Sequence, residues 1–283
     1  MQSIDERISK LIKYVRDNYG DERWSAFIKG KGIIAGMDPD VLEKEFFNYG
    51  LPRSTRMFRE YVASTFSQYV LPRLQEKGYM RILSMPCANG EEVFSLAMLV
   101  QEANNQDTKH DFYANIDGFD VSETQIDKAR TGALSIRRVR IKQFEEYVEA
   151  GYLRQVNSKF PEPNLFVQPH ITSMCEFFVH NILTQDVLPG YDVIYCMNLF
   201  LHMTSEARET ALENLTLNMQ QGALLIVDYP YKGIPSRLRL YGREKVQFGI
   251  QKEANEFYAF LHEKDLGLKR ISTTPLHNVY EKV

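Results

Sequence analysis

Residues 81–95 constrain the fold more than any other stretch, because a buried strand, a tight turn and a helix start follow one another directly. Ile82, Leu83 and Met85 form an apolar run that is long enough for a buried strand and too short for a helix. Pro86 cannot donate a hydrogen bond to a neighbouring strand, so we expect the strand to end there. The pattern predicts a strand that stops abruptly and leads into a turn.

The turn that follows consists of small residues, which lets a ligand lie against the backbone. Asn89 and Gly90 both tolerate positive φ, and glycine does so without steric cost. Glu91 and Glu92 then start a helix, where carboxylates interact favourably with the helix dipole. A carboxylate at this place can also receive the ammonium group of a ligand. An ordinary connection between a strand and a helix is the alternative interpretation, because a single glycine does not make a phosphate-binding motif.

Further apolar segments alternate with helical patterns and predict the fold class. They cover residues 112–120, 177–183, 191–196 and 222–228. Strands that alternate with helices imply a mostly parallel sheet with crossover connections. The predicted fold is therefore α/β, with a Rossmann-like sheet covered by helices on both faces. Residues 276–283 suit a strand that closes the edge of this sheet.

Several polar residues are predicted to meet at one edge of this sheet. In parallel sheets of this kind, ligands bind outside the carboxyl ends of the strands. The turn at residues 86–92, Asp120, Asn181 and Asn198 all project to that edge. An acid at the end of the second strand can bind the two hydroxyl groups of a ribose, which makes Asp120 the strongest candidate. Asp117 competes with it, but it comes before the strand has ended.

Charge and cysteine content bear on the class of function. The net charge of −3 gives no reason to expect a nucleic acid or an anionic membrane as partner. The three cysteines are scattered and lack metal-ligand spacing, which predicts a reduced, cytoplasmic protein without a metal site. No apolar run approaches the roughly eighteen residues of a spanning helix, so we expect no direct membrane insertion.

We expect two domains in the chain of 283 residues. Residues 1–72 are predicted to form a helical N-terminal domain that ends in a linker helix. Residues 73–283 are predicted to form the ligand-binding domain. Within the second domain, residues from about 134 to 175 do not follow the alternating pattern and read as a small antiparallel insertion.

An ordered set of short motifs runs from about residue 51 to residue 228. The motifs are Thr55-Arg-Met-Phe-Arg-Glu60, Ser84 through Ala97, Phe119-Asp120-Val-Ser-Glu, Lys128-Ala-Arg-Thr-Gly132, Asn181-Ile-Leu183 and Tyr195-Cys-Met-Asn-Leu199. Together they resemble the chemotaxis receptor glutamate methyltransferases, the CheR family. This resemblance implies a Rossmann-like domain that binds S-adenosylmethionine (SAM), preceded by a small helical domain.

The resemblance also implies roles for individual residues. Thr55 and Arg59 would approach the methionine end of SAM and the transfer site, with Arg59 as a catalytic residue. The remaining cofactor-binding residues would be Cys87 and Ala88 in the turn, Glu92 at the ammonium, Asp120 at the ribose, Asn181 and Ile182 at the adenine, and Asn198 at the pocket floor. The product would be S-adenosylhomocysteine (SAH), and the partner an acceptor protein such as a chemoreceptor or another signalling protein.

The chain departs from the family pattern next to the expected transfer site. Met197 replaces an arginine, and His202 replaces a tyrosine near the methyl group. His202 could deprotonate a hydroxyl or amine acceptor, since its unperturbed pKa lies near neutrality, or it could be a buried residue at a helix start. The first hypothesis is O-methylation of a protein carboxylate. The alternatives are a small-molecule or other protein acceptor, and a signalling module that binds SAM or SAH without turnover.

Overall fold

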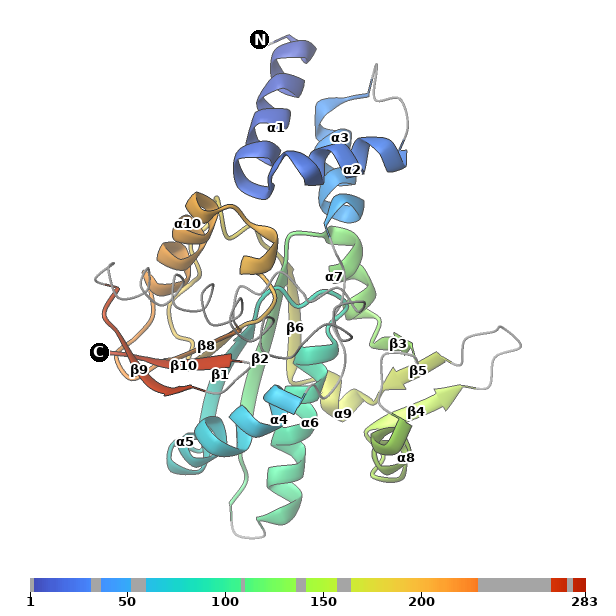
Figure 1. The fold of residues 1–283 in the computed structure, drawn as a ribbon. Helices are drawn as coiled ribbons and strands as arrows, with labels where there is room; N and C mark the ends of the chain where they lie inside the picture. The colour runs from blue at the N-terminus through green and yellow to red at the C-terminus, as the bar shows by residue number, and fades with distance from the viewer. Residues whose placement is uncertain are drawn as a thin grey trace, which may run out of the picture.

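A central sheet organises the molecule. The computed structural model describes residues 3–31, 37–51, 60–107, 110–135, 141–156, 164–228, 266–273 and 277–283. Within these ranges, seven strands form one sheet in the order β6-β2-β1-β7-β8-β10-β9 (Figure 1). The strands are β1 (Tyr79–Ser84), β2 (Tyr113–Asp120), β6 (Cys175–Val179), β7 (Val193–Cys196), β8 (Leu224–Asp228), β9 (Leu268–Thr273) and β10 (His277–Lys282).

The order in which the chain adds strands to the sheet reverses beside β1. The strands from β6 to β8 are parallel, whereas β10 is antiparallel to both β8 and β9. The chain builds β1, β2 and β6 outward on one side, then crosses to β7 and β8 on the other. Such a reversal places the ligand site outside the carboxyl ends of the strands that flank it. The predicted Rossmann-like α/β class is confirmed. The predicted edge position of the last strand is wrong, because β9 pairs with the outer side of β10.

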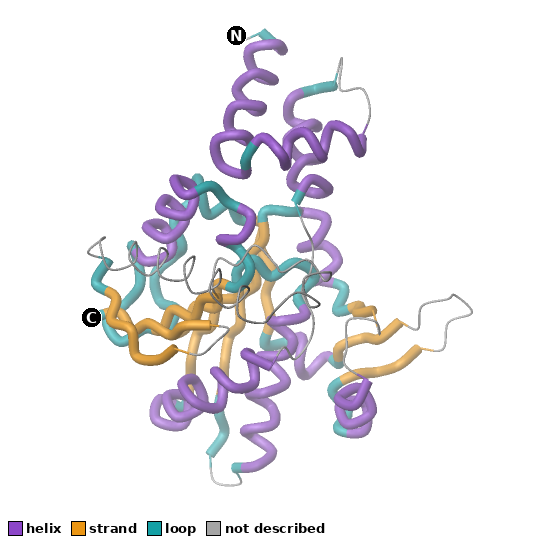
Figure 2. Tube along the Cα trace, viewed as in Figure 1, coloured by secondary structure: helices purple, strands orange, loops and turns teal. Residues whose placement is uncertain are grey.

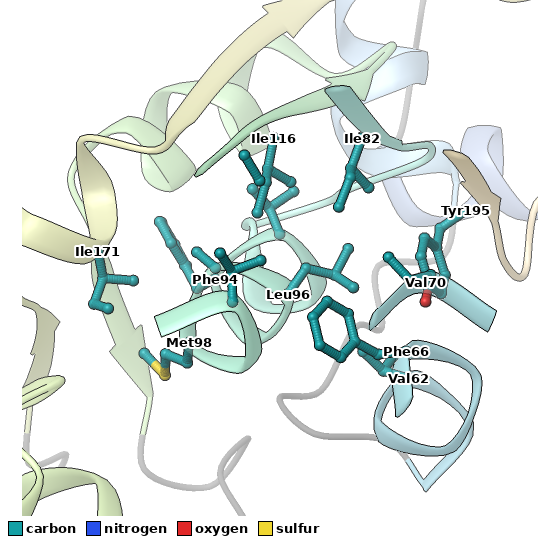
Figure 3. Close-up of a cluster of buried hydrophobic side chains, with 14 of the residues drawn as sticks. Val62, Phe66, Val70, Ile82, Phe94, Leu96, Met98, Ile116, Ile171 and Tyr195 are labelled. Carbon is teal, nitrogen blue, oxygen red and sulfur yellow. The ribbon is translucent and has the colours of Figure 1, made fainter. Parts of the chain in front are cut away.

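Both faces of the sheet are buried, as the apolar runs in the sequence require. Successive side chains of a strand point to opposite faces. In β7, Val193 and Tyr195 therefore join one core cluster, while Ile194 and Cys196 join the other. The helix that follows β1 is buried almost all round in its first two turns. Figure 3 shows the first cluster, where Phe94 and Leu96 lie among side chains from the strands and neighbouring helices.

The helices divide between these two clusters. They are α1 (Ile4–Tyr19), α2 (Asp21–Lys31), α3 (Pro39–Glu45), η1 (Phe46–Gly50), α4 (Glu60–Thr65), η2 (Phe66–Val70), α5 (Leu71–Lys77), α6 (Glu91–Gln106), α7 (Glu123–Arg130), α8 (Ile141–Glu149), α9 (Pro169–Thr172), η4 (Phe200–His202) and α10 (Ser205–Thr216). Helices α4 to α9 contribute to the first cluster, and α1 to α3 share the second cluster with α10.

The N-terminal helices form a group that lies above α10 and α7 in Figures 1 and 2. Local signals in the sequence define their starts. Ser3 and Glu6 make a capping box at the start of α1, and Asp38 caps α3 by accepting hydrogen bonds from two backbone amides. Tyr19, Trp24 and the residues around them pack as one aromatic cluster.

A second, three-stranded sheet projects from the main body beside α8, to the right in Figure 1. It consists of β3 (Ala133–Ser135), β5 (Asn164–Val167) and β4 (Leu153–Val156) in that order, all antiparallel. This is the small antiparallel element predicted between the second and third parallel strands. The exact domain boundaries at residues 72 and 73, and the limits of the insertion, stay predictions. In the described part of the chain, no helix is both long and apolar enough to cross a membrane.

Candidate functional site

A pocket opens at the carboxyl ends of the parallel strands. Six of the residues predicted from the sequence line it, namely Ala88, Asp120, Asn181, Ile182, Asn198 and His202. They come from the ends of β1, β2, β6 and β7, which is the edge where the sequence placed them. Apolar side chains such as Met85, Ile182 and Met203 make up much of the remaining wall. The pocket thus combines an apolar body with a few polar groups, as ligand sites generally do.

The turn between β1 and α6 presents its backbone to this pocket. Its two positive φ angles fall on Ala88 (46°) and Gly90 (85°). Of the two residues that tolerate positive φ, Gly90 adopts it and Asn89 does not. Cys87 points away from the pocket into the core, where its sulfur lies close to Gly118. Burial raises the pKa of the Cys87 thiol well above its ordinary value, so this group is an inert packing residue.

Asp120, at the end of β2, links its own strand to the turn that follows β1. Its Oδ2 accepts a hydrogen bond of 2.9 Å from the amide of Ala88, and its Oδ1 accepts one of 2.8 Å from the amide of Ser122. Each carboxylate oxygen has a further lone pair, so the group can also accept hydrogen bonds from a ligand. The carboxylate is nearly buried, at 8% exposure, and it lines the pocket.

Asp117, the competing acid, is engaged elsewhere. It accepts a hydrogen bond of 2.6 Å from the hydroxyl of Tyr191 and lies 3.2 Å from the guanidinium of Arg81. Burial raises the pKa of Tyr191, and the bond to Asp117 adds to this shift. Asp117 is not among the residues that line the described pocket. Its position on the strand, before the carboxyl end, explains this difference from Asp120.

Glu92 lies behind the turn instead of at the pocket wall. Its carboxylate accepts hydrogen bonds from the hydroxyl of Tyr61 in α4 and, at 2.9 Å, from that of Ser84 in β1. The side chain is buried, at 4% exposure. Glu92 therefore ties α6 to α4 and β1 within the described residues. Its predicted contact with an ammonium group stays a prediction.

The segment after β6 is fixed by polar contacts to helices on both sides. The side-chain amide of Asn181 donates a hydrogen bond of 3.0 Å to the hydroxyl of Tyr14 in α1, and its side-chain Oδ1 accepts one from the backbone amide of Leu183. The backbone carbonyl of Ile182 accepts a hydrogen bond of 2.6 Å from Asn214 in α10. These contacts hold the apolar side chain of Ile182 against the pocket.

The residues after β7 form another part of the wall. Asn198 has a φ of 62°, in the left-handed region that few residues other than glycine adopt. A strained backbone at a pocket wall is a common feature of functional sites, because the surrounding structure must hold it in place. Met197, which stands at the position of the family's arginine, is buried at 3% exposure and also lines the pocket. This part of the wall is therefore apolar.

His202 is held by a residue of the N-terminal helices. Its Nδ1 lies 2.8 Å from Nη2 of Arg23 in α2. Burial, and to a smaller extent the positive charge of Arg23, lower the pKa of His202 to about 4. The ring is therefore neutral at pH 7. Because arginine can only donate, Nδ1 must be the acceptor and Nε2 must carry the ring hydrogen. This arrangement argues against His202 as a general base, since its only basic nitrogen is occupied.

The N-terminal helices contribute pocket residues that the sequence reasoning did not identify. Tyr19, Phe47 and Leu51 line the pocket opposite the strand ends. Asn48 also accepts a hydrogen bond of 2.8 Å from the hydroxyl of Ser122. In the sequence these residues carry the same signal as ordinary packing residues, so only a contact between distant segments reveals them.

Two of the predicted site residues cannot be placed. Thr55 and Arg59 lie outside the described residues. Among the residues that the structure does describe, no group of three or more His, Cys, Asp or Glu could hold a metal ion.

Comparison with known proteins decides the family. Residues 53–228, more than half of the chain, match the family described as "CheR methyltransferase, SAM binding domain". The chain belongs to the CheR methyltransferase family. The prediction of SAM as cofactor is confirmed by this match. The donor set fits that cofactor, because Asp120 can accept hydrogen bonds from ribose hydroxyl groups and an apolar wall lies beside it.

Named relatives are similar at low identity. A chemotaxis protein methyltransferase of Listeria monocytogenes is 28% identical over 162 residues, which are 56% of each chain. One of Borreliella burgdorferi is 24% identical over 254 residues, covering 79% of this chain and 87% of that protein. One of Campylobacter jejuni is 25% identical over 174 residues, or 61% of each chain. This CheR family member thus spans little more than half the length of the Listeria protein.

Proposed function

We propose that this CheR family member is a SAM-dependent methyltransferase that O-methylates a carboxylate of a protein acceptor, with a glutamate side chain as the target. The observation that carries the proposal is the pocket at the strand ends, where Asp120, Asn181 and Asn198 meet in a chain of this family. The names of the relatives, which are chemotaxis protein methyltransferases, support a chemoreceptor or another signalling protein as partner.

The positions of Asp120, Asn181, Ile182 and Asn198 in the pocket support the proposed cofactor-binding roles. Asp120 binds the ribose, because it lines the pocket at the end of β2 and a carboxylate oxygen can accept more than one hydrogen bond. Asn181 and Ile182 contact the adenine, with the apolar side chain of Ile182 against the ring. The backbone at Cys87 and Ala88 passes close to the ligand, and Asn198 lines the floor. Glu92 is assigned to the ammonium group, as the family resemblance implies.

The chemistry makes modest demands on the protein. SAM supplies a methyl group that is already activated by the adjacent sulfonium. A glutamate carboxylate is ionised at pH 7 and needs no general base. The protein must therefore orient the carboxylate, exclude water and balance its charge while it is desolvated. A neutral His202 is compatible with this reaction, and Arg59 is assigned to the charge of the carboxylate.

The projecting sheet supports a protein acceptor over a small molecule. β3 and β4 each end the three-stranded sheet on one side within the described residues. Edge strands offer backbone groups that can pair with an extended peptide. The segment that would close over the pocket in an enzyme for small molecules, residues 229–262, lies outside the described residues.

The proposal is tested in two steps. Calorimetric titration of the purified chain with SAM and SAH comes first, and we expect binding at micromolar concentration. The chain is then incubated with methyl-tritiated SAM and the membrane and soluble fractions of its source cells. A carboxyl methyl ester releases labelled methanol in alkali, whereas a methylated amine does not.

Each outcome separates the hypotheses. Base-labile label on a protein supports the proposal. Label on a small molecule, or base-stable label on a protein, supports the altered acceptor that Met197 and His202 would allow. SAH binding without any transfer supports a signalling module without turnover, and absence of binding by a folded sample would refute the cofactor site.

A further inference from the structure

Arg23 is an unusual cation for a helix surface. It is partly buried in α2, and burial lowers its pKa. Among the described residues it has no carboxylate within ion-pair distance; its hydrogen-bond partner is Nδ1 of His202, 179 residues away in the chain. Glu22, the neighbour of Arg23 in the chain, acts on it electrostatically without an ion-pair contact. A partly desolvated guanidinium without a carboxylate in contact leaves local positive charge that an anion can balance. That charge lies directly behind a side chain of the pocket wall.

The contact defines which ring nitrogen of His202 carries hydrogen. Arg23 has no acceptor atom, so Nδ1 of His202 accepts and Nε2 is protonated. Nε2 has no hydrogen-bond partner among the described residues, and His202 is one of the residues that line the pocket. His180, the other histidine of the pocket, differs because its Nε2 lies 3.2 Å from the carbonyl of Gln185. His202 therefore offers the pocket a hydrogen-bond donor that a neighbouring cation polarises.

The charges around the pocket select the kind of group that this donor binds. Among the lining residues, Asp120 is the acid, and it belongs to the end of β2. An anionic group is repelled there and favoured near Arg23. Other lining residues, among them Asn198, Met203 and Tyr19, carry no charge at pH 7.

We propose that Arg23 and His202 form a carboxylate-recognising pair, in which Arg23 is a positioning residue that fixes the tautomer and Nε2 of His202 donates to the carboxylate. This inference rests on the proposed function, because both the acceptor glutamate and the methionine end of SAM present a carboxylate to the pocket. It replaces the general-base role of His202 with a donor role. It also gives the N-terminal helices a part in recognition.

The tautomer is measured directly by NMR. The full chain is labelled with ¹⁵N-histidine, and the His202 signals are identified by their loss in His202→Gln. We expect Nε2 protonated and Nδ1 unprotonated, without titration from about pH 5.5 to about pH 8. Arg23→Met should give a mixture of tautomers and raise the pKa of His202 above about 4, although burial, the larger cause, still holds it below the ordinary value of 6.5. A protonated Nδ1 in the wild type, or titration near neutrality, would overturn the pairing.

Two control variants separate Arg23 from other arginines. Arg16→Met removes an exposed arginine of α1 that pairs with Asp21, and it should leave the His202 signals unchanged. Arg23→Lys keeps a cationic donor and should retain the Nε2-protonated tautomer. If Arg16→Met shifts the His202 signals as much as Arg23→Met does, the effect is general and the specific contact is excluded.

The donor role is tested with His202→Gln and His202→Phe. Gln keeps an N–H donor near the place of Nε2 but cannot act as a base, whereas Phe loses the donor. We expect His202→Gln to keep nearly the wild-type affinity for the carboxylate-bearing ligand. His202→Phe should lose about tenfold to a hundredfold in this affinity, which is the usual range for a hydrogen bond to a charged group. Equal impairment of both variants, or none in either, would refute the donor role. Trp24 fluorescence checks that each variant is folded.

Binding measurements decide whether the carboxylate belongs to the methionine end of SAM or to the acceptor. The affinities of His202→Phe for SAH and for the SAH analogue without its carboxylate are compared. A loss for SAH alone assigns the donor to the methionine carboxylate. Unchanged affinity for both, with a raised KM for the methyl-accepting cell fraction, assigns it to the acceptor. If the wild type binds no SAH, the proposed function fails while the tautomer measurement remains valid.

Discussion

Asp120 contributes to the stability of the fold, unlike a residue that only contacts a ligand. Asp120→Ala removes the acceptor of two backbone amides, at Ala88 and Ser122. Each amide left unpaired costs about 1–3 kcal/mol. We therefore expect a lower free energy of unfolding and SAH affinity reduced by more than about tenfold. Asp127→Ala is the matched control, because Asp127 pairs with Arg130 on the exposed side of α7. Unchanged SAH affinity in Asp120→Ala would refute its role at the ribose.

His202 should make stability depend on pH in a defined window. The folded state keeps the ring neutral down to about pH 4, whereas the unfolded chain binds a proton below its ordinary pKa of 6.5. Stability rises with pH wherever the unfolded state binds more protons. The contribution of His202 to the free energy of unfolding is therefore complete above pH 6.5, and it decreases as the pH drops toward 4. The difference between the pKa values of His202 in the folded and unfolded states corresponds to roughly 3 kcal/mol of unfolding free energy at most.

Urea unfolding from about pH 4.5 to about pH 7.5 measures this dependence. His180 adds to the same slope, because burial also lowers its pKa. His202→Gln should therefore reduce the slope without abolishing it. An unchanged slope in this variant would show that folding does not lower the pKa of His202.

The site residues differ in how far local sequence could predict them. Asp120 was identified because it ends a strand, a property that a few neighbouring residues define. The surroundings of Glu92 and His202 were not predictable in this way. Their partners Tyr61 and Arg23 lie 31 and 179 residues away along the chain. Which nitrogen or oxygen faces the pocket depends on these distant contacts.

At the scale of elements, the turn between β1 and α6 tolerates no added bulk at Gly90. A Cβ atom there would lie 2.9 Å from the ring of Phe177 and 3.0 Å from that of Phe94. Gly151 also has a positive φ, of 75°, but no atom lies within 4 Å of its added Cβ. Gly151→Ala should cost about 1 kcal/mol from backbone strain, and Gly90→Ala about 1–3 kcal/mol more from overpacking.

Urea unfolding of Gly90→Ala and Gly151→Ala measures the difference between their free energies of unfolding. SAH affinity should fall in Gly90→Ala alone, because relief of the clash moves the turn that lines the pocket. Equal unfolding free energies would show that Phe177 and Phe94 yield without cost.

The order of the strands in the sheet is also only partly predictable from local sequence. The parallel strands were predicted because each is an apolar run between turn signals. The place of β10 between β8 and β9 was not, since a pairing partner cannot be read from the pattern of a single strand. Likewise, the sequence predicted a helical N-terminal domain, but not that Tyr19 and Phe47 line a pocket.

At the scale of the whole molecule, the pocket is built from two parts of the chain that meet only in the folded state. The N-terminal helices reach each neighbouring segment through a polar contact. Tyr14 contacts Asn181, Asn48 contacts Ser122, and Thr204 donates its amide to the carbonyl of Asn18. A ligand between these parts should therefore stabilise the attachment of the helices to the sheet.

The single tryptophan of the chain reports on this attachment. Trp24 is buried in α2, next to Arg23, and packs against Phe27 and Phe46. SAH at about a hundred times its Kd should raise the free energy of unfolding seen by Trp24 fluorescence by about 2.7 kcal/mol. Far-UV circular dichroism follows the whole fold in the same samples. Coincident shifts of both transitions mean that the helices and the sheet bind the cofactor as one unit. A shift in circular dichroism with an unmoved Trp24 transition would mean that the helices take no part in the site.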